Sequence, residues 1–307
     1  MLERIREGDP TALAAFERHV HYGYWEDPRS ANGSLEDYAR AAEEMTRLMA
    51  ELAGLRDGMR VLDVGCGFGG TLQAINERMD RMELTGLNID LRQLARANSC
   101  ARPRPGNRLR FVQGDASALP FEPESFDALL AVECSFHFPS RARFLADAAR
   151  VLRPGGRLTL SDFVPTAPMA AAWRMAGPAI DAALAPMLGH YDMSFTLDTY
   201  REAAGRAGLR LAATRDITAE ILPSIPMWQR LMRHLMPGYP GLPELFGLFA
   251  WFHRVGLIRY SVLVLERPPA ARRTLEAGGE QSDLSALGSR QGSLMPQPLE
   301  GRQLDLP

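Results

Sequence analysis

Residues 61–70 read VLDVGCGFGG, which is the most informative stretch of the chain. Its apolar residues suit a buried parallel strand, and the segment from Thr71 to Ile75 has the composition of a helix start. Glycines let the backbone turn sharply between the two and let a ligand approach without a Cβ in the way. Because amide N–H groups at a helix start favour anionic groups, the stretch predicts a loop that binds a nucleotide-type cofactor.

The spacing of the glycines alone leaves the kind of nucleotide open. Gly65, Gly67 and Gly70 also satisfy the dinucleotide fingerprint G-x-G-x-x-G. A dinucleotide oxidoreductase is therefore one alternative, and a plain strand-to-helix turn is another.

The composition of the chain narrows the class of protein. With 307 residues and 46% hydrophobic content, the chain can bury one large core, or a core and a smaller cap. Its formal net charge of -2 gives no reason to expect nucleic acid as a partner. All basic residues are Arg, which excludes Lys-dependent Schiff-base chemistry. Cys66, Cys100 and Cys134 lie far apart, so we expect reduced thiols and no metal site.

Two segments bear on localisation. Residues 1–7 have mixed charge and no apolar core, so we expect no signal peptide. The most apolar stretch, residues 245–265, is interrupted by charged and glycine residues, whereas a membrane span needs about 20 nearly uncharged residues. We therefore expect a cytoplasmic protein without stable membrane insertion, and its oligomeric state stays open.

Short apolar segments predict the strands of a sheet. They are residues 60–64, 82–87, 109–113, 128–132, 157–163, 209–216 and 260–266. Helical or turn segments separate the first five from one another, which is typical of a parallel sheet with helices on both faces. We expect an α/β fold with a Rossmann-like, seven-stranded, mostly parallel sheet.

The segments outside the sheet divide the chain further. Residues 1–55 are expected to form an N-terminal helical lid, because apolar residues recur there at three- and four-residue steps. Residues 56–267 would form the core, with inserts at 167–193 and 221–257 that cap a substrate pocket. Plain packing of these Met-rich and aromatic inserts on the sheet is the alternative. Residues 268–307 are rich in Gly, Ser, Gln and Pro and predict a disordered tail.

Polar residues follow the second and third predicted strands. Asn88 lies about 20 residues beyond the loop, where a ribose-binding acid is expected, and its amide can still bond two hydroxyls. A turn Asn is the alternative. Gln93, one helical turn further, would face the same binding site. Asp115, beside Ala116 at the next strand end, could accept a hydrogen bond from an adenine amino group.

The order of these motifs resembles that of the class I S-adenosylmethionine (SAM) methyltransferases. The resembling stretches are Leu62–Gly67, Gly114–Ala116 and Leu152–Gly156. Within that superfamily the chain is similar to small-molecule methyltransferases of natural-product pathways, such as the sugar O-methyltransferases and the tocopherol C-methyltransferases. His21–Trp25 and Ala131–Phe138 support this subgroup.

The resemblance implies where SAM binds. The residues expected at the cofactor are Tyr24, Asp63, Gly65, Cys66, Gly67, Asn88, Gln93, Asp115, Ala116 and Glu133. Asp63 and the glycines would hold the methionine half, and Asn88 departs from the family's usual acidic residue. The aromatic segment around Tyr24 would fold over the cofactor as a lid, where a ring beside the sulfonium gains about 1–2 kcal/mol. The alternative for Trp25 is an anchor that holds the lid by burial.

Methyl transfer requires alignment of nucleophile, methyl group and sulfur, and an alcohol acceptor also needs a base. His137 follows the fourth predicted strand and Asp162 ends the fifth, so adjacent parallel strands would bring them together as a base and its orienting carboxylate. Sugar-methylating relatives have a His and an Asp at these positions, although several have paired His where this chain has Phe136-His137. A structural histidine is the alternative for His137. Glu133 would bond the acceptor or stabilise a developing cation, or it is simply a helix-start acid.

These observations predict SAM-dependent methyl transfer to a hydroxyl of a small, partly apolar, natural-product-like acceptor. Methylation of carbon in an aromatic, quinone-like, terpenoid or lipid acceptor is the first alternative, and the aromatic residues of 221–257 suit it. A SAM-binding protein without transfer activity, serving as a cyclase or scaffold, is the remoter one.

Overall fold

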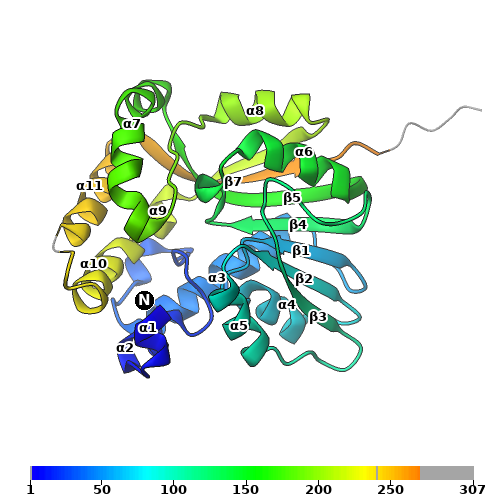
Figure 1. Cartoon of the computed structure of the whole chain (residues 1–307), viewed down its shortest axis with the longest axis horizontal. Coiled ribbons are helices and arrows are strands. Elements are labelled where there is room, and N and C mark those ends of the chain that lie inside the picture. The colour runs from blue at the N-terminus through cyan, green and yellow to red at the C-terminus, as the bar shows by residue number, and fades with distance from the viewer. Residues whose placement is uncertain (1, 240, 270–307) are drawn as a thin grey trace, which may run out of the picture. The chain divides into compact units, whose positions relative to one another are not determined.

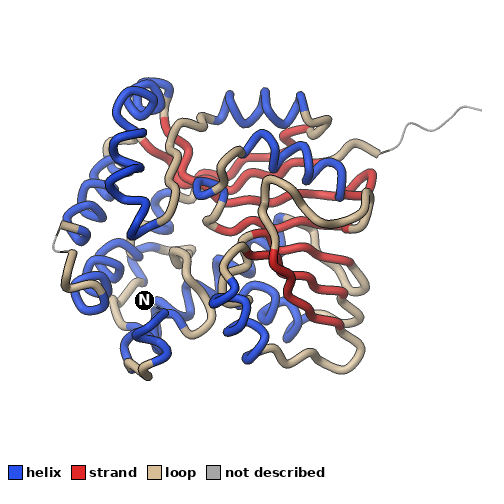
Figure 2. The backbone as a smooth tube through the Cα atoms, in the orientation of Figure 1, coloured by secondary structure: helices blue, strands red, loops and turns tan. Residues whose placement is uncertain are grey.

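The glycine loop follows the central strand of a seven-stranded sheet. The computed structural model describes residues 2–239 and 241–269. The strands lie in the order β3-β2-β1-β4-β5-β7-β6. Strand β7 is antiparallel to β5 and β6, and the other neighbours are parallel. Helices cover both faces (Figure 1), and the strands form one twisted layer (Figure 2). The expected fold class is confirmed.

The strands match the expected segments closely. They span Arg60–Val64 (β1), Glu83–Asn88 (β2), Arg108–Gln113 (β3), Phe126–Val132 (β4), Leu152–Pro165 (β5), Arg210–Asp216 (β6) and Ile258–Glu266 (β7). The largest difference is at β5, which begins at Leu152 because this residue already pairs with Phe126 of β4. Near the start of β5, Gly155 has φ +82° and its N–H donates to the Arg267 carbonyl at 2.8 Å.

Helices occupy most of the chain between and beyond the strands. They span Leu2–Arg6 (α1), Pro10–Phe16 (α2), Leu35–Leu52 (α3), Gly70–Arg78 (α4), Leu91–Cys100 (α5), Arg141–Val151 (α6), Ala167–Leu188 (α7), Leu197–Arg206 (α8), Thr218–Ile221 (α9), Ser224–Leu235 (α10) and Leu242–Arg254 (α11), with 3-10 turns at Pro28–Ser30 (η1) and Ser135–His137 (η2).

Alternation along β1 builds the two layers around the sheet. Val61 packs in a buried cluster with Leu72 and Ile75 of α4. The next residue, Leu62, points to the other face and packs in a cluster with Phe144 of α6. Successive strand side chains take opposite faces, so a strand covered on both sides is apolar throughout. Because both faces of β1 are packed against helices, the start of the glycine loop has a fixed position.

Residues 2–55 are only partly helical, whereas the sequence predicts a helical lid over residues 1–55. Residues 17–34 are irregular apart from η1, and several of their backbone N–H groups bond distant elements. The Tyr24 N–H donates to the Ala41 carbonyl at 2.8 Å, and the Gly23 N–H donates to Ser224 Oγ at 2.9 Å. Hydrogen bonds thus hold the segment between α3 and α10.

Both predicted inserts form helices on the same side of the molecule. Helix α7 comes from residues 167–193, and α10 and α11 come from residues 221–257 (Figure 1, left). No helix in the described part of the chain is both long and apolar enough to span a bilayer. The predicted tail at 268–307 lies outside the described residues, apart from Pro268 and Pro269. The division into lid, core and tail stays a prediction.

Candidate active site

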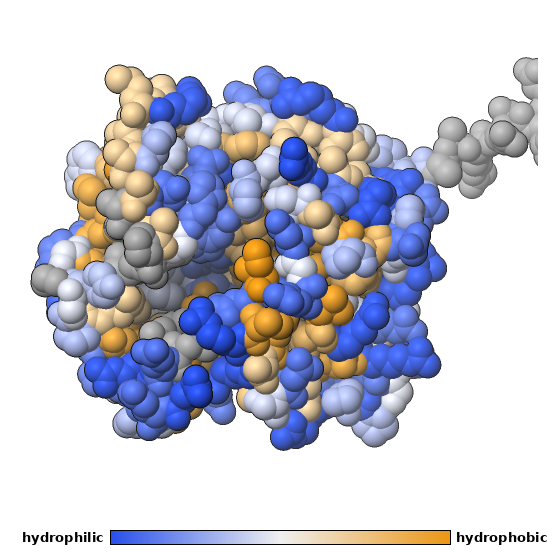
Figure 3. Space-filling view, viewed as in Figure 1, coloured by the Kyte–Doolittle hydropathy of each residue, from blue (hydrophilic) through white to orange (hydrophobic). Residues whose placement is uncertain are grey.

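A cleft of about 610 Å³ lies at the carboxyl ends of the parallel strands. Its walls come from the loops after β1, β2, β3 and β4, from residues 18–21 of the N-terminal segment, and from the end of α7 with the residues that follow. Figure 3 shows this face of the molecule hollowed between the cap helices and the sheet. Chain connections diverge on either side of β1, and open α/β sheets bind ligands at such a point.

The glycine loop forms the floor of this cleft. Gly65 has φ +74°, and a Cβ there would lie 2.8 Å from Cys134 Sγ. The N–H groups of Gly65 and Cys66 donate to the Leu87 carbonyl at 2.8 and 3.0 Å, which fixes the turn against β2. Cys66 lines the cleft as expected, and burial raises the pKa of its thiol, which lowers its reactivity as a nucleophile. Because a side chain at position 65 would collide with Cys134, replacing Gly65 would displace the loop.

Asp63 is a buried carboxyl group that forms no ion pair with the described residues. It is the second-last residue of β1, lines the cleft and is 2% exposed. Its Oδ2 atom has no hydrogen-bond partner among the described residues, and burial raises the pKa of the carboxyl to about 8. Leaving a buried polar atom unpaired costs about 1–3 kcal/mol. Such an atom fits a ligand that brings its own positive charge.

The other residues expected around the nucleotide line the same cleft. The Asn88 Nδ2 atom donates to Gln93 Oε1 at 2.8 Å, so the two amides form one polar patch at the end of β2. Asp115 accepts from the Ser117 N–H at 2.7 Å and lines the cleft beside Ala116. The structure brings these four residues together, as the sequence predicts.

The structure corrects the expected contact of Tyr24 with the cofactor. Tyr24 is not among the residues that line the cleft, and its hydroxyl accepts from Arg215 Nη2 at 2.8 Å. Trp25 is also buried away from the cleft, with its Nε1 donating to Asp37 Oδ2 at 3.1 Å. The aromatic side chains thus hold the segment in place, as the anchor alternative for Trp25 predicts.

Sequence reasoning missed the residues of this segment that do line the cleft. They are Arg18, His19, Val20 and His21. His19 faces Glu43 Oε1 at 3.0 Å, and its Nδ1 lies 3.2 Å from His21 Nε2. Gly70, which begins α4, has the His19 ring within 2.7 Å of where a Cβ would lie. The two histidines flanking Val20 were the available signal, and attention to the aromatic residues obscured it.

His137 stands at the other end of the cleft, in η2 directly after β4. Its Nδ1 is 2.6 Å from the His190 carbonyl oxygen. A carbonyl can only accept, so Nδ1 carries the proton and Nε2 is left with a lone pair. Burial lowers the pKa of His137, which keeps the ring neutral at physiological pH. The Nε2 atom of the neutral ring can therefore accept a proton.

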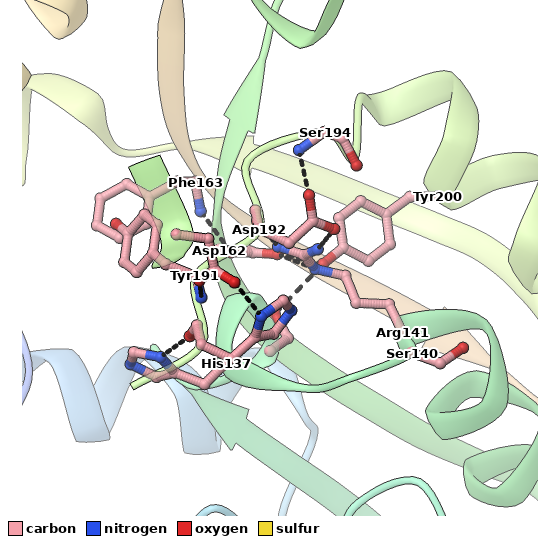
Figure 4. Close-up of polar contacts among 12 residues, drawn as sticks. His137, Ser140, Arg141, Asp162, Phe163, Tyr191, Asp192, Ser194 and Tyr200 are labelled. Carbon is pink, nitrogen blue, oxygen red and sulfur yellow. Dashed lines mark hydrogen bonds and ion pairs between the residues drawn. The ribbon is translucent and has the colours of Figure 1, made fainter. Parts of the chain in front are cut away.

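Asp162 does not orient His137 in the way that the sequence suggests. Its Oδ2 atom accepts from Arg141 Nε at 3.0 Å and from the Tyr200 hydroxyl, and its Oδ1 accepts from the Phe163 N–H at 2.8 Å (Figure 4). Among the described residues, the hydrogen-bond partner of His137 Nδ1 is a backbone carbonyl. The buried Arg141 attracts the carboxylate more strongly than a neutral imidazole does, since a charged pair is the stronger bond. The direct His137–Asp162 bond is therefore a wrong expectation.

Glu133 lines the middle of the cleft with a strained backbone. It has φ +50°, a left-handed conformation that side chains other than glycine rarely adopt. Its Oε2 accepts from the Tyr22 N–H at 2.9 Å and from the Tyr260 hydroxyl at 2.6 Å. Burial raises its pKa to about 7. Glu133 thus ties the N-terminal segment to the sheet at the cleft.

Comparisons with known proteins agree with this geometry. A family model described as a methyltransferase domain matches residues 62–160. Methyltransferase GfsG from Streptomyces halstedii is 32% identical over 82% of this chain and 87% of its own length. The 27-O-demethylrifamycin SV methyltransferase of Amycolatopsis mediterranei (strain S699) is 36% identical over 67% of this chain and 72% of its own length.

A solved structure shares the fold. The [4+2]-cyclase SpnF superposes with a TM-score of 0.67 and 23% identity, over 87% of this chain and 93% of that one. At this identity the likeness concerns the fold alone, whereas the two relatives above carry the family assignment. The chain belongs to the class I methyltransferases that use S-adenosylmethionine as their cofactor.

Proposed function

We propose that this enzyme methylates a hydroxyl of a small, partly apolar acceptor and that His137 is the base. The observation that carries the proposal is the hydrogen bond from His137 Nδ1 to the His190 carbonyl at 2.6 Å. This bond leaves Nε2 free to accept a proton at the cleft. A positioned base of this kind contributes typically about 10²–10⁴-fold to a rate.

The residues of the cleft fit the parts of SAM. The unpaired Oδ2 of Asp63 suits the ammonium of the methionine half, and the glycine loop beside it offers backbone without side chains. Asn88 and Gln93 suit the ribose hydroxyls, and Asp115 and Ala116 suit the adenine. When bound, SAM supplies an electrophilic methyl carbon. The protein then has to align the acceptor oxygen and exclude water.

The surroundings of His137 support an acceptor with apolar surface. Tyr191 lies 5.8 Å from the His137 ring and 4.8 Å from Phe136, measured between ring centroids. Trp173 of α7 and Phe249 of α11 pack on Tyr191 at 6.2 and 6.1 Å. These four rings are not among the residues that line the cleft, and they form an apolar cluster beside His137. Apolar side chains beside a few polar groups are typical of small-molecule sites. The name of the rifamycin relative, which refers to an oxygen position, supports a hydroxyl as the acceptor group.

Methylation of carbon is the second candidate, and one observation favours it. Glu133 lines the cleft, and its pKa of about 7 lets it either stabilise a cation or donate a proton near neutral pH. An electron-rich ring needs a base only after the new carbon–carbon bond has formed, so Glu133 would then matter more than His137.

Isotope labelling separates the two candidates. The enzyme is incubated with SAM carrying a trideuteromethyl group and with metabolite extract from its source, and labelled products are fragmented by mass spectrometry. The proposal expects the label on an oxygen of an apolar product. A label on carbon would transfer the catalytic role to Glu133.

A further inference from the structure

The base is held by a loop of the cap, and that loop is held by a buried arginine. The loop consists of residues 189–194, between α7 and α8. His190 supplies the carbonyl that fixes His137, and two residues later the Asp192 carboxylate accepts a hydrogen bond from the buried Arg141. What positions Asp192 therefore also positions the base.

Arg141 ties Asp192 to the sheet. The side chain of this arginine is 1% exposed, and its Nε donates to Asp162 Oδ2 at 3.0 Å. Its Nη1 donates to Asp192 Oδ2 at 2.8 Å, and its Nη2 donates to the Asp192 carbonyl at 2.6 Å. Figure 4 shows the guanidinium between the two carboxylates. Such charge-assisted, two-pronged contacts are strong and fix geometry.

The loop and the turn that carries the base also bond each other directly. The Asp192 N–H donates to the Phe136 carbonyl at 2.9 Å, while His137 Nδ1 donates to the His190 carbonyl. These two bonds run in opposite directions between residues 136–137 and 190–192. A shift of the loop would break both, and the imidazole would lose its fixed tautomer.

A second tie holds the loop from the side of the cap. Asp181 of α7 accepts from the Tyr191 N–H at 2.7 Å and from the His190 side chain at 3.0 Å. The peptide between His190 and Tyr191 is therefore fixed by a residue of the cap, while Asp192 fixes the same loop to the core. The cap and the base are mechanically coupled.

We propose that Asp192 is a positioning residue, which holds the loop so that the His190 carbonyl fixes His137 with its Nε2 lone pair free at the cleft. Asp181 performs the same task from α7. Asp162 then acts on the base through Arg141 and Asp192 and not by direct contact. The inference rests on the proposed role of His137 for its effect on the rate, but not for its effect on the tautomer.

The test replaces Asp192 by Ala and follows His137 itself. In protein labelled with ¹⁵N at histidine, the two ring nitrogens report which of them carries the proton, and His137→Gln assigns the signal. We expect wild-type His137 to be protonated at Nδ1, and Asp192→Ala and Asp181→Ala each to give a mixture of tautomers. Asp198→Ala, which removes an aspartate from the exposed surface of α8, is the matched control and should leave the signal unchanged.

Kinetics give the second readout. Asp192→Ala should lower kcat about tenfold to a hundredfold with little change in the KM for SAM, because misplacing a catalytic group by about 1 Å has effects of this size. Binding of S-adenosylhomocysteine and thermal melting verify that each variant is folded. If Asp192→Ala does not fold, Asp181→Ala provides the test.

Two outcomes decide the inference. If His137 stays protonated at Nδ1 in whichever of the two variants fold, the positioning role is refuted. If the tautomer changes while kcat is unaffected, the positioning role stands and the assignment of His137 as the base fails.

Discussion

The two halves of the cleft differ in how their polar groups are satisfied. In the half that we propose for the cofactor (the cofactor half), after β1 to β3, the buried Asp63 keeps an oxygen without a partner among the described residues. In the half that we propose for the acceptor (the acceptor half), Asp162 is bonded to Arg141, and His137 to the His190 carbonyl. The proposal gives the first half a charge that the ligand brings. In the second half, long-range contacts of the protein satisfy these groups, and the proposal uses the remaining lone pair of His137 as the base.

The largest effect should come from the acceptor half. His137→Ala should lower kcat about 10²–10⁴-fold, because the acceptor hydroxyl loses its base. Binding of S-adenosylhomocysteine should change less than about threefold, since the variant leaves the cofactor half intact. Turnover by mass spectrometry and calorimetric titration measure the two. Equal losses in both would show that the halves are not separable.

Asp63→Asn should produce the opposite pattern. The neutral amide keeps the size of the side chain but cannot match the charge of the methionine ammonium. Breaking a buried charged pair of this kind costs about 2–4 kcal/mol, which is about 30- to 1000-fold in Kd for SAM. Titration calorimetry tests this, with Asp57→Asn on the surface as control. Unchanged affinity would contradict the assignment of Asp63.

Asp63 should also make the stability of the ligand-free enzyme depend on pH. Its carboxyl has a pKa of about 8 in the fold against 3.8 as the ordinary value. Between these values the folded chain binds more protons than the unfolded chain, so the free energy of unfolding falls as pH rises and levels off above about pH 8. Thermal melts should show a smaller fall for Asp63→Asn than for the wild type. Parallel curves would mean that the carboxyl titrates normally.

The smallest effect concerns the lid segment. Trp25→Phe removes the hydrogen bond to the buried Asp37 and should lower the free energy of unfolding by about 1–2 kcal/mol. The ratio of the affinities for SAM and S-adenosylhomocysteine should stay the same, because Trp25 does not line the cleft. Chemical denaturation and titration measure the two quantities. A selective loss of SAM affinity would instead indicate a contact with the sulfonium.

Local sequence was sufficient for the fold and for the walls of the cofactor half. Apolar runs mark β1 to β7, and Gly65 and Gly67 have positive φ where the backbone turns at the cleft. Asp63, Asn88 and Asp115 lie at strand ends or directly after them, where parallel topology brings them to one edge. Each of these features follows from a local pattern of a few neighbouring residues, which a single sequence displays.

The acceptor half depends on contacts that a single sequence does not display. Asp162 and His137 were expected to pair because their strands are neighbours. Arg141 begins the next helix and reaches Asp162 first, and a loop about fifty residues after His137 supplies its actual partner. The place of Tyr24 was missed for the same reason, since Arg215 of β6 decides it. Competition between partners distant in the chain has no local signal.

The pH dependence of kcat/KM, compared between wild type and His137→Ala, shows whether His137 is the base. Wild-type activity should fall at acid pH as His137 is protonated, at a pH below the ordinary pKa of histidine because burial lowers it. His137→Ala should be slow and should lack this fall. The same acid fall in the variant, at a comparable rate, would mean that another group is the base.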